Sequence, residues 1–174
     1  MLYILIIIGV ASRLLPHPPN FAPIMALGLF AGAYLNKKTA FIIPVVAMLI
    51  ADYFIGFYDV KIMLSVYACI VLGSLVGHKL KNKKSVSNIA LSTLAVSVIF
   101  FVVTNFSLWF FSDFYPHTAE GLSLCFTMAI PYFQNSLLGN AVYVIFFFGS
   151  YELLGKQVDL KISEKLHAVK INND

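Results

Sequence analysis

The run of residues 86–111 contains no charged side chain, and this feature constrains the fold more than any other. A helix needs roughly 20 consecutive apolar residues to cross a bilayer, and the run is longer than that. The whole chain is 60% apolar or aromatic and only 11% charged, whereas soluble domains are about 45–50% apolar and ~25% charged. The sequence therefore predicts an integral membrane protein. The same composition excludes a disordered, collagen-like or disulfide-scaffold chain.

Apolar segments separated by short polar stretches predict an all-α integral membrane protein with a six-helix bundle. They cover residues 1–15, 21–35, 40–57, 62–77, 86–111 and 131–154, and the first, second and fourth are short for a complete crossing. Residues 122–130 cover only about half a span, so we expect a re-entrant or interfacial half-helix there. Pro131 would then open the last span. The predicted organisation is a membrane domain over residues 1–155 and a basic cytoplasmic tail over residues 156–174.

The basic residues are distributed unequally between the two sides of this predicted bundle. Cytoplasmic loops of membrane proteins retain Lys and Arg. Ten of the twelve bases fall on one side, namely Lys37, Lys38, Lys79, Lys81, Lys83, Lys84, Lys156, Lys161, Lys165 and Lys170. We therefore expect a multi-pass protein of the inner (cytoplasmic) membrane with both termini in the cytoplasm. The net charge of +4 then reflects topology and not a nucleic-acid surface. Residues 1–15 lack a basic leader, so we expect a retained helix and not a signal peptide.

With this orientation, the polar residues inside the predicted helices lie in the outer half of the bilayer. They are one cation, one carboxylate and several amides: Arg13, Asp52, Asn105, Gln134, Asn135 and Asn140. A charge inside a membrane costs a few kcal/mol, so we expect Arg13 and Asp52 to face the bundle interior and to have partners. Trp109 lies just beyond Asn105. The sequence thus concentrates polar chemistry at one depth.

The predicted outer loops add further polar residues to this layer. His17 and Asn20 lie in the run RLLPHPPNFAPI, and His117 lies in FYPHTAEG. Prolines in the first loop keep it extended and stiff, as a lid or wall would be. We predict an outward-opening pocket for a small polar heterocyclic or anionic solute. The predicted binding residues are Arg13, His17, Asn20, Asp52, Asn105, Trp109, His117, Gln134 and Asn135.

Simpler explanations exist for each of these residues. Arg13 and Asp52 could form only a structural ion pair that joins two helices. The asparagines could make interhelical hydrogen bonds worth ~0.6 kcal/mol each. His17 and His117 are not spaced as zinc ligands, so we expect them to be loop residues, and we expect no metal and no cofactor. The two cysteines, Cys69 and Cys125, lie in apolar stretches and are interpreted as small hydrophobic residues.

Small residues in the second segment form two helical stripes, Ala22 with Ala26 and Gly28 with Gly32. A spacing of four places each pair on one helix face and permits close approach of another helix. That helix could belong to this chain or to a partner membrane protein. These four residues are therefore candidates both for internal packing and for partner docking.

Motifs for catalysis and for ATP hydrolysis are absent from the sequence. There is no GxxxxGK run followed by Ser or Thr, and no HExxH or GxSxG. We therefore expect neither an enzyme nor a self-powered transporter. No internal repeat is visible, which counts against an inverted-repeat transporter.

Four runs carry a resemblance to a known family: SRLLPHPPNFAPIMALGLFAGAYL, IADYFIGFYD, TNFSLWFFSDFYPHTAEGLSLC and AIPYFQNSLLGNAVYVIFFFGSYELL. Across residues 1–155 the chain resembles a family of small uncharacterised bacterial membrane proteins described as transport proteins. That family is similar to the S components of energy-coupling factor (ECF) transporters, which are six-helix, substrate-capturing subunits. The resemblance implies high-affinity binding of a vitamin or similar micronutrient, with an ECF coupling subunit and a pair of cytoplasmic ATPases as partners.

The residues and the resemblance together predict a substrate-binding membrane subunit for uptake of a small water-soluble solute. The alternative is a non-transport membrane protein, structural or partner-regulating, whose polar cluster only packs the bundle. A stand-alone facilitator would need a polar path through the inner half, and the sequence offers no comparable cluster there.

Overall fold

The computed structural model describes residues 2–155, 157, 158 and 161, and over residues 2–155 it contains helices and no strand. The helices are α1 (Leu2–Arg13), α2 (Ile24–Tyr34), α3 (Lys37–Ile55), α4 (Val60–Leu80), α5 (Val86–Phe111) and α6 (Ala119–Ser150), followed by the π-helical turn η1 (Tyr151–Gly155). The predicted all-α fold is confirmed. The tail predicted over residues 156–174 lies almost entirely outside the described residues.

In the described part of the chain, four helices are long and apolar enough to cross a membrane: α3, α4, α5 and α6. Helices α1 and α2 have only 12 and 11 residues. At ~1.5 Å per residue, each reaches about half of a ~30 Å hydrocarbon core. The six predicted spans therefore become four helices of spanning length and two shorter apolar helices. The fourth segment was expected to be short, but α4 has 21 residues.

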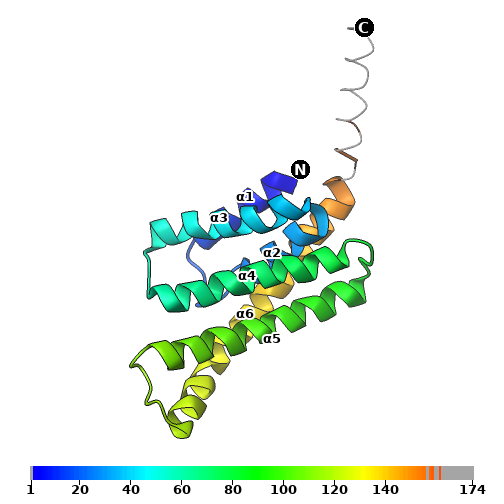
Figure 1. Ribbon diagram of the computed structural model, residues 1–174. Coiled ribbons are helices and arrows are strands. Elements are labelled where there is room, and N and C mark those ends of the chain that lie inside the picture. The colour runs from blue at the N-terminus through cyan, green and yellow to red at the C-terminus, as the bar shows by residue number, and fades with distance from the viewer. Residues whose placement is uncertain (1, 156, 159–160, 162–174) are drawn as a thin grey trace.

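The predicted half-helix over residues 122–130 is wrong, because those residues belong to the continuous helix α6. Pro131 lies inside this helix and does not open a new one. Proline is tolerated within membrane helices because neighbouring groups compensate for the missing N–H. Pro44 lies inside α3 in the same way. Helix α6 has 32 residues and runs obliquely behind α4 and α5 (Figure 1).

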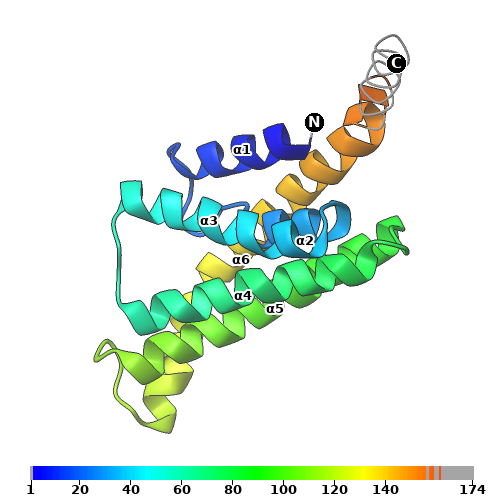
Figure 2. The same cartoon turned by 45° about the horizontal axis from the view of Figure 1, so that its top comes forward.

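Helix α2 is the centre of the bundle. Nine of its eleven residues, Met25 to Ala33, are buried. The axes of α1, α3, α4 and α5 are roughly aligned, with α3, α4 and α5 running alternately in opposite directions, and α2 packs against both α3 and α4 (Figure 1 and Figure 2). The contact with α4 is close because Gly28 and Gly32 of α2 meet Gly73 and Gly77 of α4, backbone against backbone.

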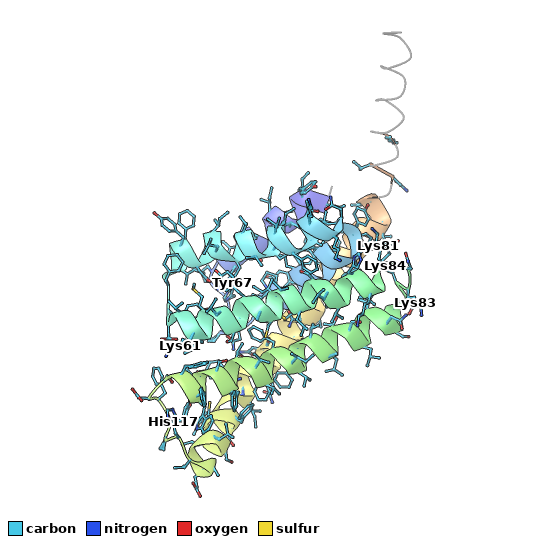
Figure 3. The ribbon with its side chains drawn as sticks, viewed as in Figure 1. Lys61, Tyr67, Lys81, Lys83, Lys84 and His117 are labelled. Carbon is cyan, nitrogen blue, oxygen red and sulfur yellow. The ribbon has the colours of Figure 1, made fainter. Side chains whose placement is uncertain are left out.

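The bundle has two chemically different ends. We call one the lysine end, which holds Lys37, Lys38, Lys79, Lys81, Lys83 and Lys84, and the other the loop end, which holds the connections 14–23, 56–59 and 112–118. Figure 3 shows Lys81, Lys83 and Lys84 together at the lysine end and Lys61 and His117 at the loop end. Side-chain caps from Asp59 and Thr118 begin α4 and α6 at the loop end.

Aromatic rings fill the core toward the lysine end. Phe30 is fully buried, and its ring centroid lies 5.5 Å from those of both Phe147 and Phe148. Tyr34 continues the cluster with its ring 4.4 Å from that of Tyr151, and Lys84 lies over the ring of Tyr34. Unfilled space remains at both ends of the bundle: an open apolar groove between α5 and α6, with Val86, Ile89 and Phe148 in its lining, lies nearer the lysine end, and a smaller cavity with polar groups on its wall lies nearer the loop end.

Candidate solute-binding cavity

A cavity of ≈ 180 Å³ lies near the loop end of the bundle. It is lined by Arg13, His17, Asn20, Ala22, Ile24, Met25, Ile55, Phe100, Ser136 and Asn140. The short central helix explains it: residues 14–23 form an irregular loop with a turn over residues 18–21, and α2 begins only at Ile24. A cavity of ~150 Å³ in another protein holds one benzene molecule. The space therefore suits a solute of about one ring.

Arg13 and Asp52 form an ion pair beside this cavity. The Nη2 of Arg13 donates to Oδ1 of Asp52 at 2.8 Å, and the hydroxyl of Tyr67 donates to Oδ2 at 2.8 Å. The Nη1 of Arg13 contacts the sulfur of Met48. Asp52 is 1% exposed and the Arg13 side chain 15%. Tyr67 comes from α4 (Figure 3), so three helices meet at this network.

The loop 56–59 adds Tyr58 to the surroundings of this ion pair. Burial and, to a smaller extent, the negative charge of Asp52 raise the pKa of Tyr58 to about 12, while Arg13 opposes the rise. The phenol is therefore neutral at physiological pH. The charges at this site are those of Arg13 and Asp52.

Asn140 forms the inner wall of the cavity and is 1% exposed. Its Oδ1 accepts from the backbone N–H of Ala26 at 3.3 Å, and its Nδ2 donates to Oγ of Ser97 at 2.9 Å. A backbone N–H can only donate, so the amide oxygen must face α2. This amide thus joins α2, α5 and α6 and caps the first turn of α2.

The proline-rich loop 14–23 covers the cavity. The Nε2 of His17 is buried and has no hydrogen-bond partner among the described residues. Asn20 has a positive φ of 62°, which asparagine tolerates better than most residues. The Nδ2 of Asn135 donates to the carbonyl oxygen of Pro19 at 3.0 Å and so ties the loop to α6.

The remaining predicted residues lie elsewhere. Asn105 donates to the carbonyl of Phe101 within α5 and lines a smaller crevice that also contacts Asn20. The indole of Trp109 donates to the carbonyl of Pro116 at 2.9 Å, and His117 packs edge-on against it. These two residues close the α5–α6 loop. Gln134 is exposed.

The structure thus brings together five of the nine predicted residues: Arg13, His17 and Asn20 line the cavity, Asp52 holds Arg13, and Asn135 holds the loop. Sequence reasoning missed Tyr67, because a tyrosine in an apolar segment carries no signal of its partner. It predicted Asn140 in the same polar layer as the other amides but left it out of the site. Both residues have hydrogen-bond partners that are distant in sequence.

The four small residues of the second predicted segment are all buried within the chain, Ala22 in the loop before α2 and the other three in α2 itself. Gly28 and Gly32 lie against α4, Ala22 lines the cavity, and the N–H of Ala26 is bonded to Asn140. Helix α4 of this chain therefore already occupies the glycine stripe. Among the described residues, no group of three or more His, Cys, Asp or Glu side chains could hold a metal ion.

Comparison with known proteins identifies a family but no relative of established activity. No curated protein matches the chain. No solved structure matches it either. A family model matches residues 1–165, which is nearly the whole chain. The chain therefore belongs to this family, a family of unknown function designated DUF6580.

Proposed function

We propose that the chain is the substrate-capturing membrane subunit of an uptake transporter for a small, vitamin-like solute. The observation that carries this proposal is the one-ring-sized cavity near the loop end, with Arg13 and His17 on its wall. Ligand sites are typically mostly apolar cavities with a few placed polar groups. The wall fits that description, since Ile24, Met25 and Phe100 supply its apolar part.

The lysine distribution supports an outward-facing cavity. We infer from the positive-inside rule that the lysine end faces the cytoplasm. The loop end is then on the outer side of the inner membrane, and both termini are on its cytoplasmic side. The cavity then opens toward the side from which a nutrient arrives. The aromatic packing around Phe30 between the cavity and the lysine end supports capture rather than a continuous channel.

The absence of a nucleotide-binding motif in the sequence supports a role within a larger transporter. A chain that holds a solute but carries no such motif needs another source of energy, such as a partner ATPase, for uptake against a gradient. The resemblance to S components of ECF transporters suggests a coupling subunit with a pair of ATPases.

A purely structural role has one observation in its favour. Both carboxylate oxygens of Asp52 are already bonded, one to Arg13 and one to Tyr67. Such a satisfied network can join α1, α3 and α4 without any ligand. The two functions differ in whether the protein retains a solute.

Native mass spectrometry of the protein, gently extracted from expressing cells, tests the proposal. We expect a bound small molecule in the wild type and its loss in Ala22→Leu, which fills the cavity. The matched control is Ala141→Leu, at an exposed position of α6, and it should retain the molecule. Equal masses with no adduct in all three proteins, under conditions in which they remain folded, would contradict solute capture.

A further inference from the structure

We propose that the captured solute is an anion, a one-ring carboxylate whose carboxylate group accepts hydrogen bonds from Arg13. This inference rests on the proposed function and names the chemical class of its substrate. It depends on a difference between the two charged residues: Arg13 lines the cavity, whereas Asp52 does not. The cavity wall therefore includes the cation Arg13, while its counter-ion, Asp52, lies outside the cavity lining.

The guanidinium of Arg13 has more N–H donors than its contacts within the protein use. Arginine carries five N–H donors in a fixed fork. One nitrogen, Nη2, donates to Asp52, and Nη1 contacts the sulfur of Met48, which is a weak acceptor. Both oxygens of Asp52 already accept a hydrogen bond, from Arg13 and from Tyr67, and Asp52 is 1% exposed and does not line the cavity, so its remaining lone pairs are not offered there. The ion pair thus offers a ligand more donors than acceptors.

Other polar groups on the wall also act as donors. The oxygen of Asn140 faces the N–H of Ala26, and its NH₂ group gives one hydrogen to Ser97, which leaves the second N–H as a free donor. The partnerless Nε2 of His17 can donate, either in the imidazolium or in one neutral tautomer. These residues reach the same cavity from α6 and from the loop 14–23.

The first turn of α2 has the same polarity. Ile24 and Met25 begin this helix on the cavity wall, and the N-cap residue, Pro23, makes no side-chain cap hydrogen bond. The N–H groups of a first helical turn have no partner within the helix and carry a partial positive charge. This turn adds to the Arg13 and His17 donors in favouring a negatively charged group.

The rest of the wall defines the body of the solute. Ala22, Ile24, Met25, Ile55 and Phe100 give an apolar surface. An apolar ring on this surface would place a single carboxylate toward Arg13. A neutral ring rich in acceptors would use the same donors without the charge, and binding measurements separate the two.

Benzoate and benzamide are suitable probes, because they are nearly equal in size and differ in charge. Equilibrium dialysis with the full chain in lipid nanodiscs should show benzoate binding at least about tenfold tighter, since a hydrogen bond to a charged group is worth about a decade of affinity. Arg13→Gln should remove this preference. Asp52→Asn should strengthen benzoate binding severalfold, because it leaves Arg13 without its competing anion.

The opposite signs of the two single variants are the decisive feature. If the pair served only as a latch, both single variants would weaken binding alike, and that result would overturn the proposal. The double variant, Arg13→Gln with Asp52→Asn, keeps the shape without the charges and should bind both probes equally. If Asp52→Asn alone does not fold, this double variant still tests whether the charges determine the preference for benzoate.

The failure of this inference can be distinguished from failure of the proposed function. Equal or tighter binding of benzamide to the wild type would overturn the proposal that the solute is an anion. A neutral solute retained in native mass spectrometry would overturn it too, but would agree with solute capture. If neither probe binds, the proposal of a one-ring anion as the solute is also overturned. Only the absence of any retained molecule would contradict the capture function as well.

Discussion

At the scale of single residues, Asn140 is the side chain on which the inner wall of the cavity depends. It is buried, and its amide holds both the N–H of Ala26 and the hydroxyl of Ser97. Helix α2 begins inside the bundle, where its first N–H groups are shielded from water. The amide supplies one of the acceptors that this helix start requires.

Asn140→Leu is expected to destabilise the protein by about 1–3 kcal/mol, because it leaves a buried backbone donor and a buried hydroxyl without this partner. This exceeds the ~0.6 kcal/mol average for a membrane hydrogen bond, since two bonds are lost. Gln134→Leu, at an exposed site on the same helix, is the control and should be nearly neutral. Chemical unfolding in mild detergent measures both. Equal stability of the two variants would show that the amide is dispensable.

Part of the site could be predicted from residue types alone. Arg13 and Asp52 are opposite charges inside predicted helices, and the cost of an unpaired charge makes their pairing a physical necessity. The asparagines could not be told apart in this way. Asn105 bonds within its own helix, Asn135 bonds the loop, and Asn140 bonds two other helices. These differences depend on which helix face meets which neighbour.

At the scale of elements, the contact between α2 and α4 fixes the bundle. A Cβ added to Gly32 would overlap the backbone carbonyl oxygen of Ser74, and one added to Gly77 would overlap that of Leu29. Backbone atoms cannot move aside as a flexible side chain would. In contrast, a Cβ added to Gly149 of α6 meets nothing within 4 Å.

Gly32→Ala is therefore expected to destabilise the protein by roughly 1–3 kcal/mol or more, as overpacking of a tight contact does. Gly149→Ala makes the same chemical change in open space and should be neutral, or stabilising by up to about 1 kcal/mol through helix propensity. Thermal unfolding of the two variants side by side gives the comparison. A destabilised Gly149→Ala with an unaffected Gly32→Ala would contradict the described packing.

Most helices could be predicted from apolar length, and α5 agrees at both ends because Ser85 caps its start and polar loop residues follow Phe111. The error at α6 arose from Pro131. A proline removes one helical hydrogen bond, and this matters less when neighbouring groups compensate within a bundle. The sequence around Pro131 shows no turn residues that would distinguish a break from a continuous helix.

At the scale of the whole molecule, capture of a solute from outside requires that the lysine end face the cytoplasm. Single cysteines at Asn82 and Phe114, in a background without Cys69 and Cys125, test this with a membrane-impermeant thiol reagent. We expect labelling at position 114 in intact cells and at position 82 only after lysis, because lysines gather near position 82. Both native cysteines are buried, so the variant with Cys69→Ala and Cys125→Ala must first be shown to fold. Labelling of intact cells at position 82 alone would reverse the proposed topology.

The most direct test of the central claim is an electron-density map of the cavity in crystals of the protein as purified from expressing cells. We expect compact non-protein density of about one ring between Arg13 and Asn140, within hydrogen-bond distance of the guanidinium. Crystals of Ala22→Leu should lack this density while the Arg13–Asp52 pair stays in place. An empty cavity, or one filled by a lipid chain entering from the side, would contradict capture of a water-soluble solute.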